Sequence, residues 1–293
     1  MKSVRAFAPG NISCIFVIKK GKSPATTGSL GLGFTVNKGV TVTINKIHNN
    51  KESDKKISNI KNNNKKNKIY FNNKKINFPT VDSVIKKLTH EKVIVNIKSE
   101  LPLGYGFGIS GASALATAYA SNKLLNLKRS KKKLALIAHI AEVENSTGLG
   151  DVVNQYYGGF LVKYESSYKF KINKIPIKNK KIHYRYFSSI NTEKIISNGK
   201  NRNKINNSGI KALKMIKKLD KKSLKLKNVM KISKEFSINS ALLKNKDIIE
   251  IIRNIENKNG NASMIMLGNA VFSDTKFKGS KELMIKDKGA YLC

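Results

Sequence analysis

The sequence predicts a mixed α+β protein with room for two lobes. Strand-like alternation and amphipathic helical patterns are interspersed along the whole chain, as in proteins that pack helices on sheets. The 293 residues, 40% of them hydrophobic, can fill two lobes of about 150 residues each. We expect an amino-terminal lobe over residues 1–165 and a carboxy-terminal α+β lobe over 166–293.

The first lobe is expected to combine strands, helices and one solvated insertion. Strand patterns lie at about 3–8, 14–19, 39–46, 92–98 and 160–165, and helical patterns at 81–88, 111–125 and 131–145. Ser130 offers an N-cap to the last of these helices. Residues 46–78 read as an insertion, and the Asn/Lys-rich stretch 48–78 within it predicts a solvated hairpin or loop.

The second lobe shows the same mixture in a different order. A strand pattern begins near residue 182, helical patterns lie near 207–219, 224–234 and 247–257, and strand-like runs follow at 262–273 and 281–286. Runs of helices between strands indicate an α+β lobe.

The chain is strongly basic, with a formal net charge of +39 from 57 basic and 18 acidic residues. Only five of the basic residues are arginines, and the lysines are spread through every segment together with many asparagines. Nucleic-acid grooves usually mix arginine and aromatic residues into one patch. We therefore attribute the charge to a compositional bias and expect no specific nucleic-acid partner, although such a field would attract small anions.

Neither a membrane span nor a secretory signal is expected. No apolar run approaches the roughly twenty residues that span a bilayer, and the amino terminus lacks a hydrophobic stretch. The two cysteines, Cys14 and Cys293, do not define a disulfide framework. These features predict a cytoplasmic protein.

A glycine-rich segment, Pro102-Leu-Gly-Tyr-Gly-Phe-Gly-Ile-Ser-Gly-Ala-Ser113, carries the strongest functional signal. Gly104, Gly106 and Gly108 can adopt positive φ and let backbone amides close on a ligand. The helix expected at 111–125 would aim its amino-terminal N–H groups at the same spot. The segment therefore predicts a phosphate-binding loop.

The loop fits neither a Walker loop nor a dinucleotide fingerprint. A Walker loop ends in Gly-Lys-Ser/Thr, but here Gly108-Ile-Ser-Gly contains no lysine. A dinucleotide fingerprint needs an acidic residue about twenty positions later, where this chain has residues such as Asn122 and Lys123.

The pattern Pro-x-x-x-Gly-x-Gly-x-Ser-Gly-Ala resembles the phosphate loop of the GHMP family of small-molecule kinases. Three further segments are similar to family motifs in the same order: Arg5–Ser13 with its Ala-Pro-Gly, Glu142–Asp151 followed by Gly158-Gly159, and Gly260–Gly268. The resemblance implies a fold of two α+β lobes with the active site in the cleft between them.

Within that family, Ala-Glu-Val-Glu-Asn-x-Thr-Gly-Leu-Gly-Asp and Ala-Ser-Met-x-Met-Leu-Gly-Asn resemble the archaeal pantoate kinases. The resemblance implies ATP- and Mg²⁺-dependent phosphorylation of the primary hydroxyl of pantoate, giving 4-phosphopantoate for coenzyme A synthesis. Two alternatives stay open. One is another GHMP kinase acting on homoserine or a different small hydroxy acid, and the other is a non-catalytic, basic RNA-associated protein.

The expected ATP-binding residues all lie in the loop and the first turn of its helix. They are Pro102, Gly104, Gly106, Gly108, Ser110, Gly111, Ala112 and Ser113. Ser110 is in addition a candidate Mg²⁺ ligand, as the family serine is, and an N-cap of the helix is the alternative.

A carboxylate is the natural second Mg²⁺ ligand, and Glu142 and Glu144 are the candidates. Residues two apart on a helix point in different directions, so we choose Glu142, which shares a face with Ala138 and Ala141. Nearby His139 is expected to be a packing or hydrogen-bonded residue.

Asp151 is, by its position in the family motif, the catalytic residue that accepts or orients the acceptor hydroxyl. Its alternative role is an N-cap for a helix that begins at Val152.

The acceptor is expected to contact Asn11, Ser29 and Gly268. Ser29 lies in a second glycine-rich segment, 25–34, which predicts a loop that could bind a carboxylate. Leu30 stands where pantoate kinases are expected to carry a basic residue, and Asn11 where mevalonate kinases carry a lysine. Arg5 and Lys19 are then the candidates for a cation facing the transferred phosphoryl group, and a homodimer is left open.

Overall fold

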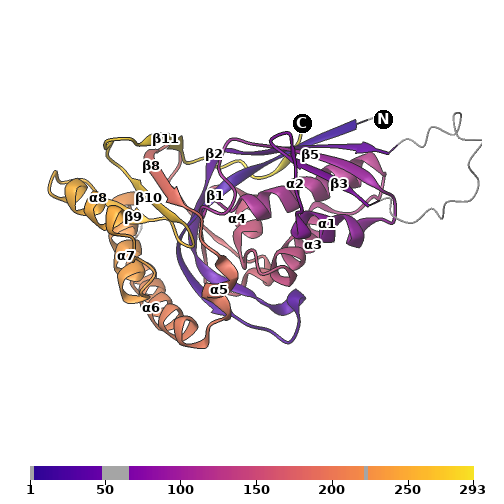
Figure 1. Ribbon diagram of the computed structural model, residues 1–293. Coiled ribbons are helices and arrows are strands. Elements are labelled where there is room, and N and C mark those ends of the chain that lie inside the picture. Colours follow the sequence, from indigo (N-terminus) through magenta and orange to yellow (C-terminus); the bar gives the residue numbers. More distant parts are fainter. Residues whose placement is uncertain (1–2, 48–65, 221–223) are drawn as a thin grey trace, which may run out of the picture.

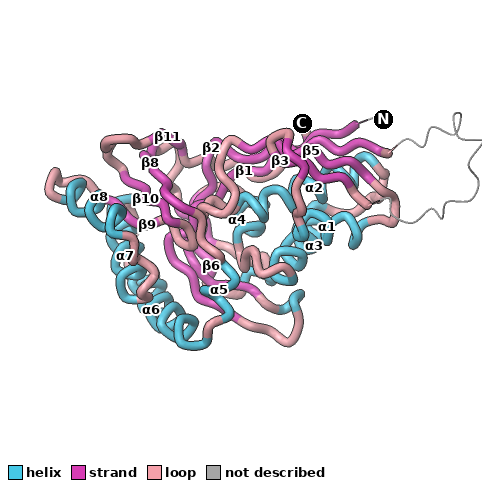
Figure 2. Tube along the Cα trace, in the orientation of Figure 1, coloured by secondary structure: helices cyan, strands magenta, loops and turns pink. Residues whose placement is uncertain are grey.

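Two β-sheets with helices packed against them form the molecule (Figures 1 and 2). The computed structural model describes residues 3–47, 66–220 and 224–293. Residues 48–65, the larger part of the expected insertion, lie outside these ranges. No helix of the described residues is long and apolar enough to cross a membrane.

The larger sheet has the strand order β12-β1-β2-β5-β3-β4, with β6 and β7 joined to the far end of β2. Its strands are β1 (Ser3–Lys19), β2 (Gly28–Lys46), β3 (Lys68–Phe71), β4 (Lys74–Lys75), β5 (Val93–Ser99), β6 (Phe160–Lys163), β7 (Asn173–Ile175) and β12 (Tyr291–Leu292). All pairs are antiparallel except β3 with β5, which is parallel.

One long hairpin, β1 with β2, dominates this sheet. Strands were expected at 3–8 and 14–19, but β1 is continuous, because bulges at Pro9/Asn11 and Ser13/Ile15 absorb the irregular Ala-Pro-Gly segment within the pairing. The loop expected at 25–34 is also wrong from Gly28 onward, since Gly28 pairs with Lys19 at the start of β2. A short 3₁₀ turn, η1 (Pro24–Thr26), precedes it.

The described end of the insertion, residues 66–78, is a hairpin of β3 and β4, as the sequence predicted for this stretch. β3 continues the sheet beside β5, whose Val93, Val95 and Ile97 alternate into the core. The hairpin is therefore an edge of the sheet rather than a separate solvated element.

Four helices cover one face of this sheet (Figure 1): α1 (Pro79–Leu88), α2 (Ile109–Leu124), α3 (Lys131–Glu144) and α4 (Asp151–Tyr157). α2 lies centrally among β1, β2, α1 and α3. Its alanines, serines and threonine are buried almost all round, which explains why its sequence shows no polar face. α3 begins after Ser130, whose side chain accepts from the Lys133 N–H as expected of an N-cap.

The smaller sheet has the order β11-β8-β10-β9, built from β8 (Lys181–Ser188), β9 (Ala262–Met264), β10 (Asn269–Ser273) and β11 (Lys281–Met284). Its companion helices are α5 (Thr192–Ser197), α6 (Gly199–Lys218), α7 (Leu226–Asn239) and α8 (Lys246–Glu256), and a short 3₁₀ turn, η2 (Ser167–Lys169), follows β6. The α+β class is confirmed for the amino-terminal and carboxy-terminal parts alike.

The two halves of the chain are interlocked. β7 pairs with β6, and the carboxy-terminal strand β12 returns to pair with β1, so both termini lie on the same side of the molecule (Figure 1). α6 and α7 also pack against β1, and one continuous core extends through both sheets. Two strands after residue 165, β7 and β12, thus belong to the larger sheet.

Candidate active site

The glycine-rich loop connects β5 to α2 and takes a conformation that demands its glycines. Gly104, Gly106 and Gly108 have φ values of 89°, 84° and 63°. These left-handed values are readily adopted only by glycine. The backbone is additionally held from two sides, because the Asn11 N–H donates to the Phe107 carbonyl (2.9 Å) and Gln155 Nε2 donates to the Gly108 carbonyl (2.7 Å).

A cavity of about 330 Å³ opens beside this loop. Its walls come from β1, β2, the loop, the 145–151 turn, β6, α5 and residues 266–267, so distant parts of the chain converge on it. Of the expected ATP-binding residues, Gly104, Gly106, Gly108 and Ser110 line the cavity.

The other expected ATP-binding residues lie behind this surface. Gly111, Ala112 and Ser113 are buried in α2, and the Ala112 N–H already donates to the Gly108 carbonyl within the helix. Pro102 does not line the cavity either. Of the expected ATP-binding residues, only the loop glycines and Ser110 therefore face the cavity.

Ser110 is the second residue of α2 and does not cap it. The N-cap position belongs to Gly108, and no side-chain cap is formed. The Ser110 hydroxyl faces the cavity and lies 3.4 Å from Thr80 Oγ1. The N-cap alternative is thus excluded, and the hydroxyl is available to a ligand.

Glu142, on α3, is fully buried directly behind the first turn of α2. A Cβ placed on Gly111 would lie 2.7 Å from Glu142 Oε2, and neither carboxylate oxygen has a hydrogen-bond partner among the described residues. Burial, and then the charge of Asp151, raise the pKa of Glu142 well above 4.5, and the nearby Thr147 hydroxyl opposes that rise. The Glu142 carboxylate and the cavity-lining Ser110 hydroxyl, whose bond to Thr80 is long at 3.4 Å, have the oxygen chemistry of Mg²⁺ ligands.

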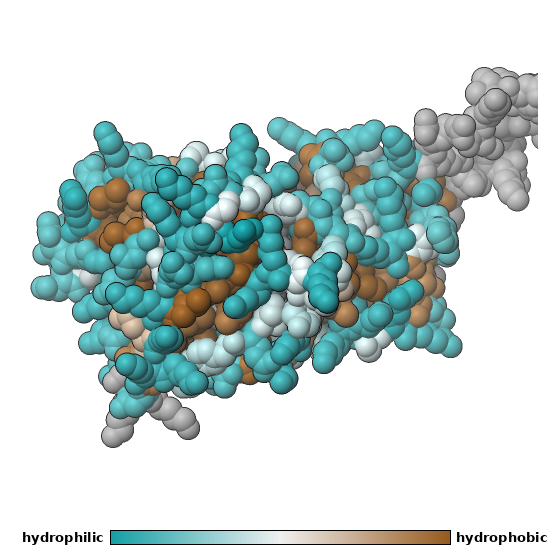
Figure 3. Space-filling view, turned by 90° about the horizontal axis from the view of Figure 1, so that it is seen from below, coloured by the Kyte–Doolittle hydropathy of each residue, from teal (hydrophilic) through white to brown (hydrophobic). Residues whose placement is uncertain are grey.

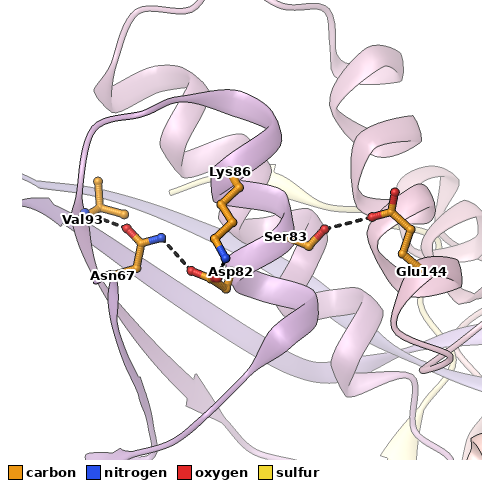
Figure 4. A network of polar contacts seen from close by, with 6 residues as sticks. All are labelled: Asn67, Asp82, Ser83, Lys86, Val93 and Glu144. Carbon is orange, nitrogen blue, oxygen red and sulfur yellow. Dashed lines mark hydrogen bonds and ion pairs between the residues drawn. The ribbon is translucent and has the colours of Figure 1, made fainter. Parts of the chain in front are cut away.

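Glu144, the alternative ligand, is occupied elsewhere (Figure 4). Ser83 Oγ donates to Glu144 Oε2 (3.1 Å), and Lys87 Nζ donates to its Oε1 (2.7 Å), both from α1. α1 is fastened further by Asp82, which accepts from Asn67 Nδ2 at 2.8 Å. Glu144 therefore joins α3 to α1 and does not line the cavity.

Asp151 lies in the cavity wall at the start of α4. Its Oδ1 accepts from Asn11 Nδ2 (2.6 Å) and Ser13 Oγ (3.2 Å). Gly150 occupies the N-cap position and α4 has no side-chain cap, so the carboxylate does not serve as one. A Cβ on Gly108 would lie 3.3 Å from Asp151 Cβ, which places the carboxylate at the end of the phosphate loop.

The environment of Asp151 makes it more basic than an ordinary aspartate. Burial raises its pKa, while the charge of Lys163 and the hydrogen bonds from Asn11 and Ser13 oppose that rise. A carboxylate tuned upward in this way is suited to general-base work.

Lys163, at the end of β6, is the cation of this cavity, and sequence reasoning missed it. Its ammonium group donates to the Gly150 carbonyl (3.1 Å) and to Asn154 Oδ1 (2.7 Å). Burial lowers its pKa to about 8, and the nearby Asp151 limits the shift. Arg5 and Lys19 were the candidates for the cation that faces the transferred phosphoryl group. Both are exposed on β1, and neither lines the cavity.

The three expected acceptor contacts have different surroundings. Ser29 lines the cavity from β2, where its hydroxyl donates to the Leu149 carbonyl at 3.3 Å. Asn11 is fully buried and does not line the cavity, but its side chain hydrogen-bonds to Ser13, Asp151 and Asn154, which do. Gly268 packs behind Tyr105, whose carbonyl oxygen would lie 2.1 Å from a Cβ there, so its smallness serves loop packing.

His139 has the structural role expected from the sequence. It is buried in α3, and its Nε2 lies 2.9 Å from the Thr27 carbonyl oxygen. Burial lowers its pKa to about 4, which keeps the ring neutral near physiological pH.

Comparisons with known proteins agree with this geometry. Residues 77–159 match the family model described as the GHMP kinases N terminal domain. The chain is 34% identical over 292 residues to a pantoate kinase from Methanocaldococcus jannaschii, covering 98% of both proteins. It is also 29% identical to a pantoate kinase from Methanospirillum hungatei, covering 92% of this chain and 86% of that protein.

Solved structures give the same fold. One described as a phosphotransferase related to the CoA biosynthesis pathway superposes with a TM-score of 0.81, at 24% identity, covering 99% of this chain and 98% of the other. A homoserine kinase from Cytophaga hutchinsonii superposes with a TM-score of 0.66, at 17% identity, covering 100% and 98%. The sequence motifs, the two-lobed α+β fold and the full-length similarity lead to one conclusion: the chain belongs to the GHMP kinase family, where its sequence groups with proteins named pantoate kinase.

Proposed function

We propose that this protein is an ATP-dependent kinase that phosphorylates the primary hydroxyl of pantoate, giving 4-phosphopantoate for coenzyme A synthesis. The observation that carries the proposal is one cavity holding a glycine-rich phosphate loop, a carboxylate raised in basicity and a buried lysine. Full-length similarity to proteins named pantoate kinase supports the choice of acceptor.

The donor side is suited to the phosphates of ATP. The three left-handed glycines line the cavity and leave room for a phosphate against the backbone, and the amino terminus of α2 adds the positive end of its dipole. Because Asp151 adjoins the last glycine of the loop, a terminal phosphoryl group held there would be next to the base.

The acceptor side is suited to a small, branched hydroxy acid. Ser29 Oγ and Lys163 Nζ flank Gly150, at 2.3 and 3.3 Å from where a Cβ on that glycine would lie. These two groups could bind a carboxylate, and apolar side chains that include Ile15, Leu30 and Leu32 line the same cavity. Pantoate combines a carboxylate with two methyl groups on one carbon, whereas homoserine would bring an ammonium group toward Lys163.

The transfer step then needs only positioning, charge neutralisation and one proton acceptor. The primary hydroxyl oxygen of the acceptor attacks the γ-phosphorus of ATP, and the bond between that phosphorus and the bridging oxygen of ADP breaks. Asp151 takes the hydroxyl proton, and its raised pKa favours that transfer.

Mg²⁺ is part of the proposal, held by Ser110 and Glu142. Both have the oxygen chemistry that Mg²⁺ prefers, and the unpartnered carboxylate of Glu142 is otherwise costly to bury. When bound, the ion would neutralise charge on the phosphates.

Location and assembly complete the proposal. A reducing compartment such as the cytoplasm suits the buried, free Cys14 and the exposed, free Cys293. We regard the protein as archaeal in type because its named relatives come from archaea. The homodimer stays a prediction, which sedimentation of the purified protein would check.

An acceptor screen tests the function. Purified protein with ATP and Mg²⁺ should phosphorylate pantoate with a higher kcat/KM than pantothenate, homoserine or mevalonate, and Asp151→Asn should lose this activity. A higher kcat/KM for another of these acceptors would overturn the proposed substrate. No phosphorylation of any of them would overturn the kinase proposal as stated.

A further inference from the structure

Four polar side chains form a continuous hydrogen-bonded chain across the floor of the active site. Lys163 Nζ donates to Asn154 Oδ1 (2.7 Å), Asn154 Nδ2 donates to Asn11 Oδ1 (2.9 Å), and Asn11 Nδ2 donates to Asp151 Oδ1 (2.6 Å). Lys163, Asn154 and Asn11 are 4%, 1% and 0% exposed, so they are closed off from competing solvent. This Lys163–Asp151 chain joins β6 and α4, which are neighbours in the sequence, to β1, which lies about 140 residues earlier.

The two ends of the chain determine its direction. An ammonium group can only donate hydrogen bonds and an ionised carboxylate can only accept them. Asn154 must therefore turn its carbonyl oxygen toward Lys163 and its amide nitrogen toward Asn11, and Asn11 must turn its amide nitrogen toward Asp151. Each amide has one orientation that satisfies both neighbours, and aligned bonds of this kind strengthen one another.

The two carboxylate oxygens of Asp151 differ in their hydrogen bonds. Oδ1 receives both Asn11 and Ser13, whereas Oδ2 receives no hydrogen bond from any described residue. The same Asn11 donates its backbone N–H to the Phe107 carbonyl of the phosphate loop, at 2.9 Å. Asn11 thereby fixes the position of the Asp151 carboxylate relative to the loop, and Oδ2 stays available to an incoming hydroxyl.

We propose that Asn154 is a positioning residue for phosphoryl transfer: acting through Asn11, it holds Asp151 with Oδ1 saturated and Oδ2 facing the acceptor hydroxyl. Lys163 forms the other end of this chain, which we call the relay. The relay therefore links Lys163, which is suited to bind the acceptor carboxylate, to Asp151, which takes the proton of the acceptor hydroxyl. The proposal rests on the kinase function given above. The proposal adds Asn154, which lies outside the family motifs identified in the sequence.

Asn154→Asp tests the proposal most sharply because it keeps the shape of the side chain and reverses the polarity of the relay. An aspartate at 154 still accepts from Lys163 but cannot donate to Asn11. Asn11 then turns its amide nitrogen toward residue 154 and its carbonyl oxygen toward Asp151. We expect kcat to fall by ~10- to 100-fold while the KM for ATP stays within about twofold, as for a misplaced catalytic group.

The pH profile gives a readout that a merely structural role would not move. Lys163 from β6 and Glu142 from α3 are the charged groups that act on Asp151, and both remain in the variant. Loss of the Asn11 donor and addition of a carboxylate both favour the protonated form of Asp151. The acid limb of kcat should therefore move to higher pH in Asn154→Asp.

Asn206→Asp is the matched control. The Asn206 amide also makes two hydrogen bonds, to the Ile18 N–H (2.7 Å) and carbonyl (3.1 Å), but it joins α6 to β1 outside the relay and the cavity. This variant should lose stability without a change in kcat or in its pH limb. Equal kinetics and equal pH profiles for the two variants would overturn the relay.

The experiment separates the relay from the choice of substrate. If the wild type uses another acceptor, the same comparison is made on that acceptor and the pantoate assignment alone fails. If no acceptor is turned over, ¹³C NMR titration of the Asp151 carboxyl, assigned with Asp151→Asn, replaces kinetics. A pKa of Asp151 that is unchanged in Asn154→Asp would then contradict the proposal.

Discussion

The charge of Asp151 can be removed without altering its size, which isolates its chemical role. Asp151→Asn keeps the loop glycines and α2 that would hold ATP, but it cannot accept a proton from the acceptor. We expect ATP affinity within about twofold of wild type and a kcat lower by ~10²- to 10⁴-fold, the usual contribution of a positioned base. Calorimetric ATP binding and steady-state rates measure the two effects, and near-normal turnover in a folded variant would remove Asp151 from the mechanism.

The neighbouring acids Glu142 and Glu144 make a matched pair for the metal. Glu142 is buried behind the phosphate loop without a partner, whereas Glu144 is paired with Lys87 at the surface. Glu142→Gln should raise the Mg²⁺ concentration for half-maximal rate several-fold, because a carboxylate ligand is lost. Glu144→Gln should leave it unchanged, and the reverse order would move the ligand assignment to Glu144.

Glu142 should also make the stability of the metal-free protein depend on pH. Its pKa in the folded state lies well above the ordinary 4.5, so the fold favours its protonated form. The associated stability is complete below about pH 4.5 and is lost as the pH rises through the folded-state pKa, with a slope of at most about 1.4 kcal/mol per pH unit. Urea unfolding in EDTA should show a weaker pH dependence for Glu142→Gln than for wild type or Glu144→Gln.

Individual site residues could be predicted where they belong to a sequence motif. They could not be predicted where only tertiary packing brings them to the site. Ser110, Glu142 and Asp151 stand in recognisable segments, and the structure gathers all three around the start of α2 and α4. Lys163 is one of many lysines in a basic chain, and only the pairing of β6 with β2 and β7 buries it. The role of Asn154 depends on contacts with β1 and β6, which no local pattern contains.

At the scale of the elements, two glycines of the phosphate loop allow two effects of an added side chain to be measured separately. These effects are backbone strain and steric collision with neighbouring residues. Gly104 and Gly106 have similar φ values, 89° and 84°. A Cβ on Gly104 would meet only Ser189 Cβ at 3.4 Å, whereas one on Gly106 would lie 2.9 Å from the Met266 carbonyl oxygen.

Gly104→Ala should therefore carry the cost of left-handed backbone alone, about 1–3 kcal/mol. Gly106→Ala should lose more stability and should weaken ATP binding, because the loop must move away from residues 266–268. Urea unfolding and calorimetric ATP titration would measure both effects. Equal losses in the two variants would show that contact between the loop and this segment is unimportant.

Elements with a clear local signal could be predicted best, and glycine-rich or interrupted ones could not. α8 lies within about one residue of its expected bounds because its apolar face repeats regularly, and α3 does so because Ser130 caps its start, whereas α6 begins well before the expected 207 and α7 ends beyond the expected 234. Residues 28–34 of β2 were interpreted as part of a glycine-rich loop because glycines usually interrupt strands. Here their lack of side chains lets β1 and β2 approach closely, which only the tertiary pairing reveals.

For the whole molecule, the mixed α+β class and the two-lobed fold followed from periodicity and from the family motifs, respectively. The pairing of strands from the two halves of the chain could not be predicted from the sequence. β12 contains two residues and has no pattern of its own, yet it pairs with β1 and brings the chain back to the first sheet. The face seen from below is largely hydrophilic, with hydrophobic residues gathered across its middle (Figure 3).

The net charge of +39 allows a final test at this scale, because a kinase and an RNA-binding protein respond differently to salt. If the charge reflects composition, RNA binding should be non-specific and should collapse between about 50 and 200 mM salt, since each neutralised phosphate adds a slope of roughly −0.7 to −0.9 in log K against log salt. Phosphorylation of pantoate should persist over the same range, because backbone amides inside a cavity are screened less than surface charges. Filter binding of RNAs of unrelated sequence and a coupled ADP assay, run in the same buffers, measure the two responses. RNA binding that is sequence-selective at 200 mM salt, together with no transfer to any small alcohol, would overturn the kinase in favour of an RNA partner.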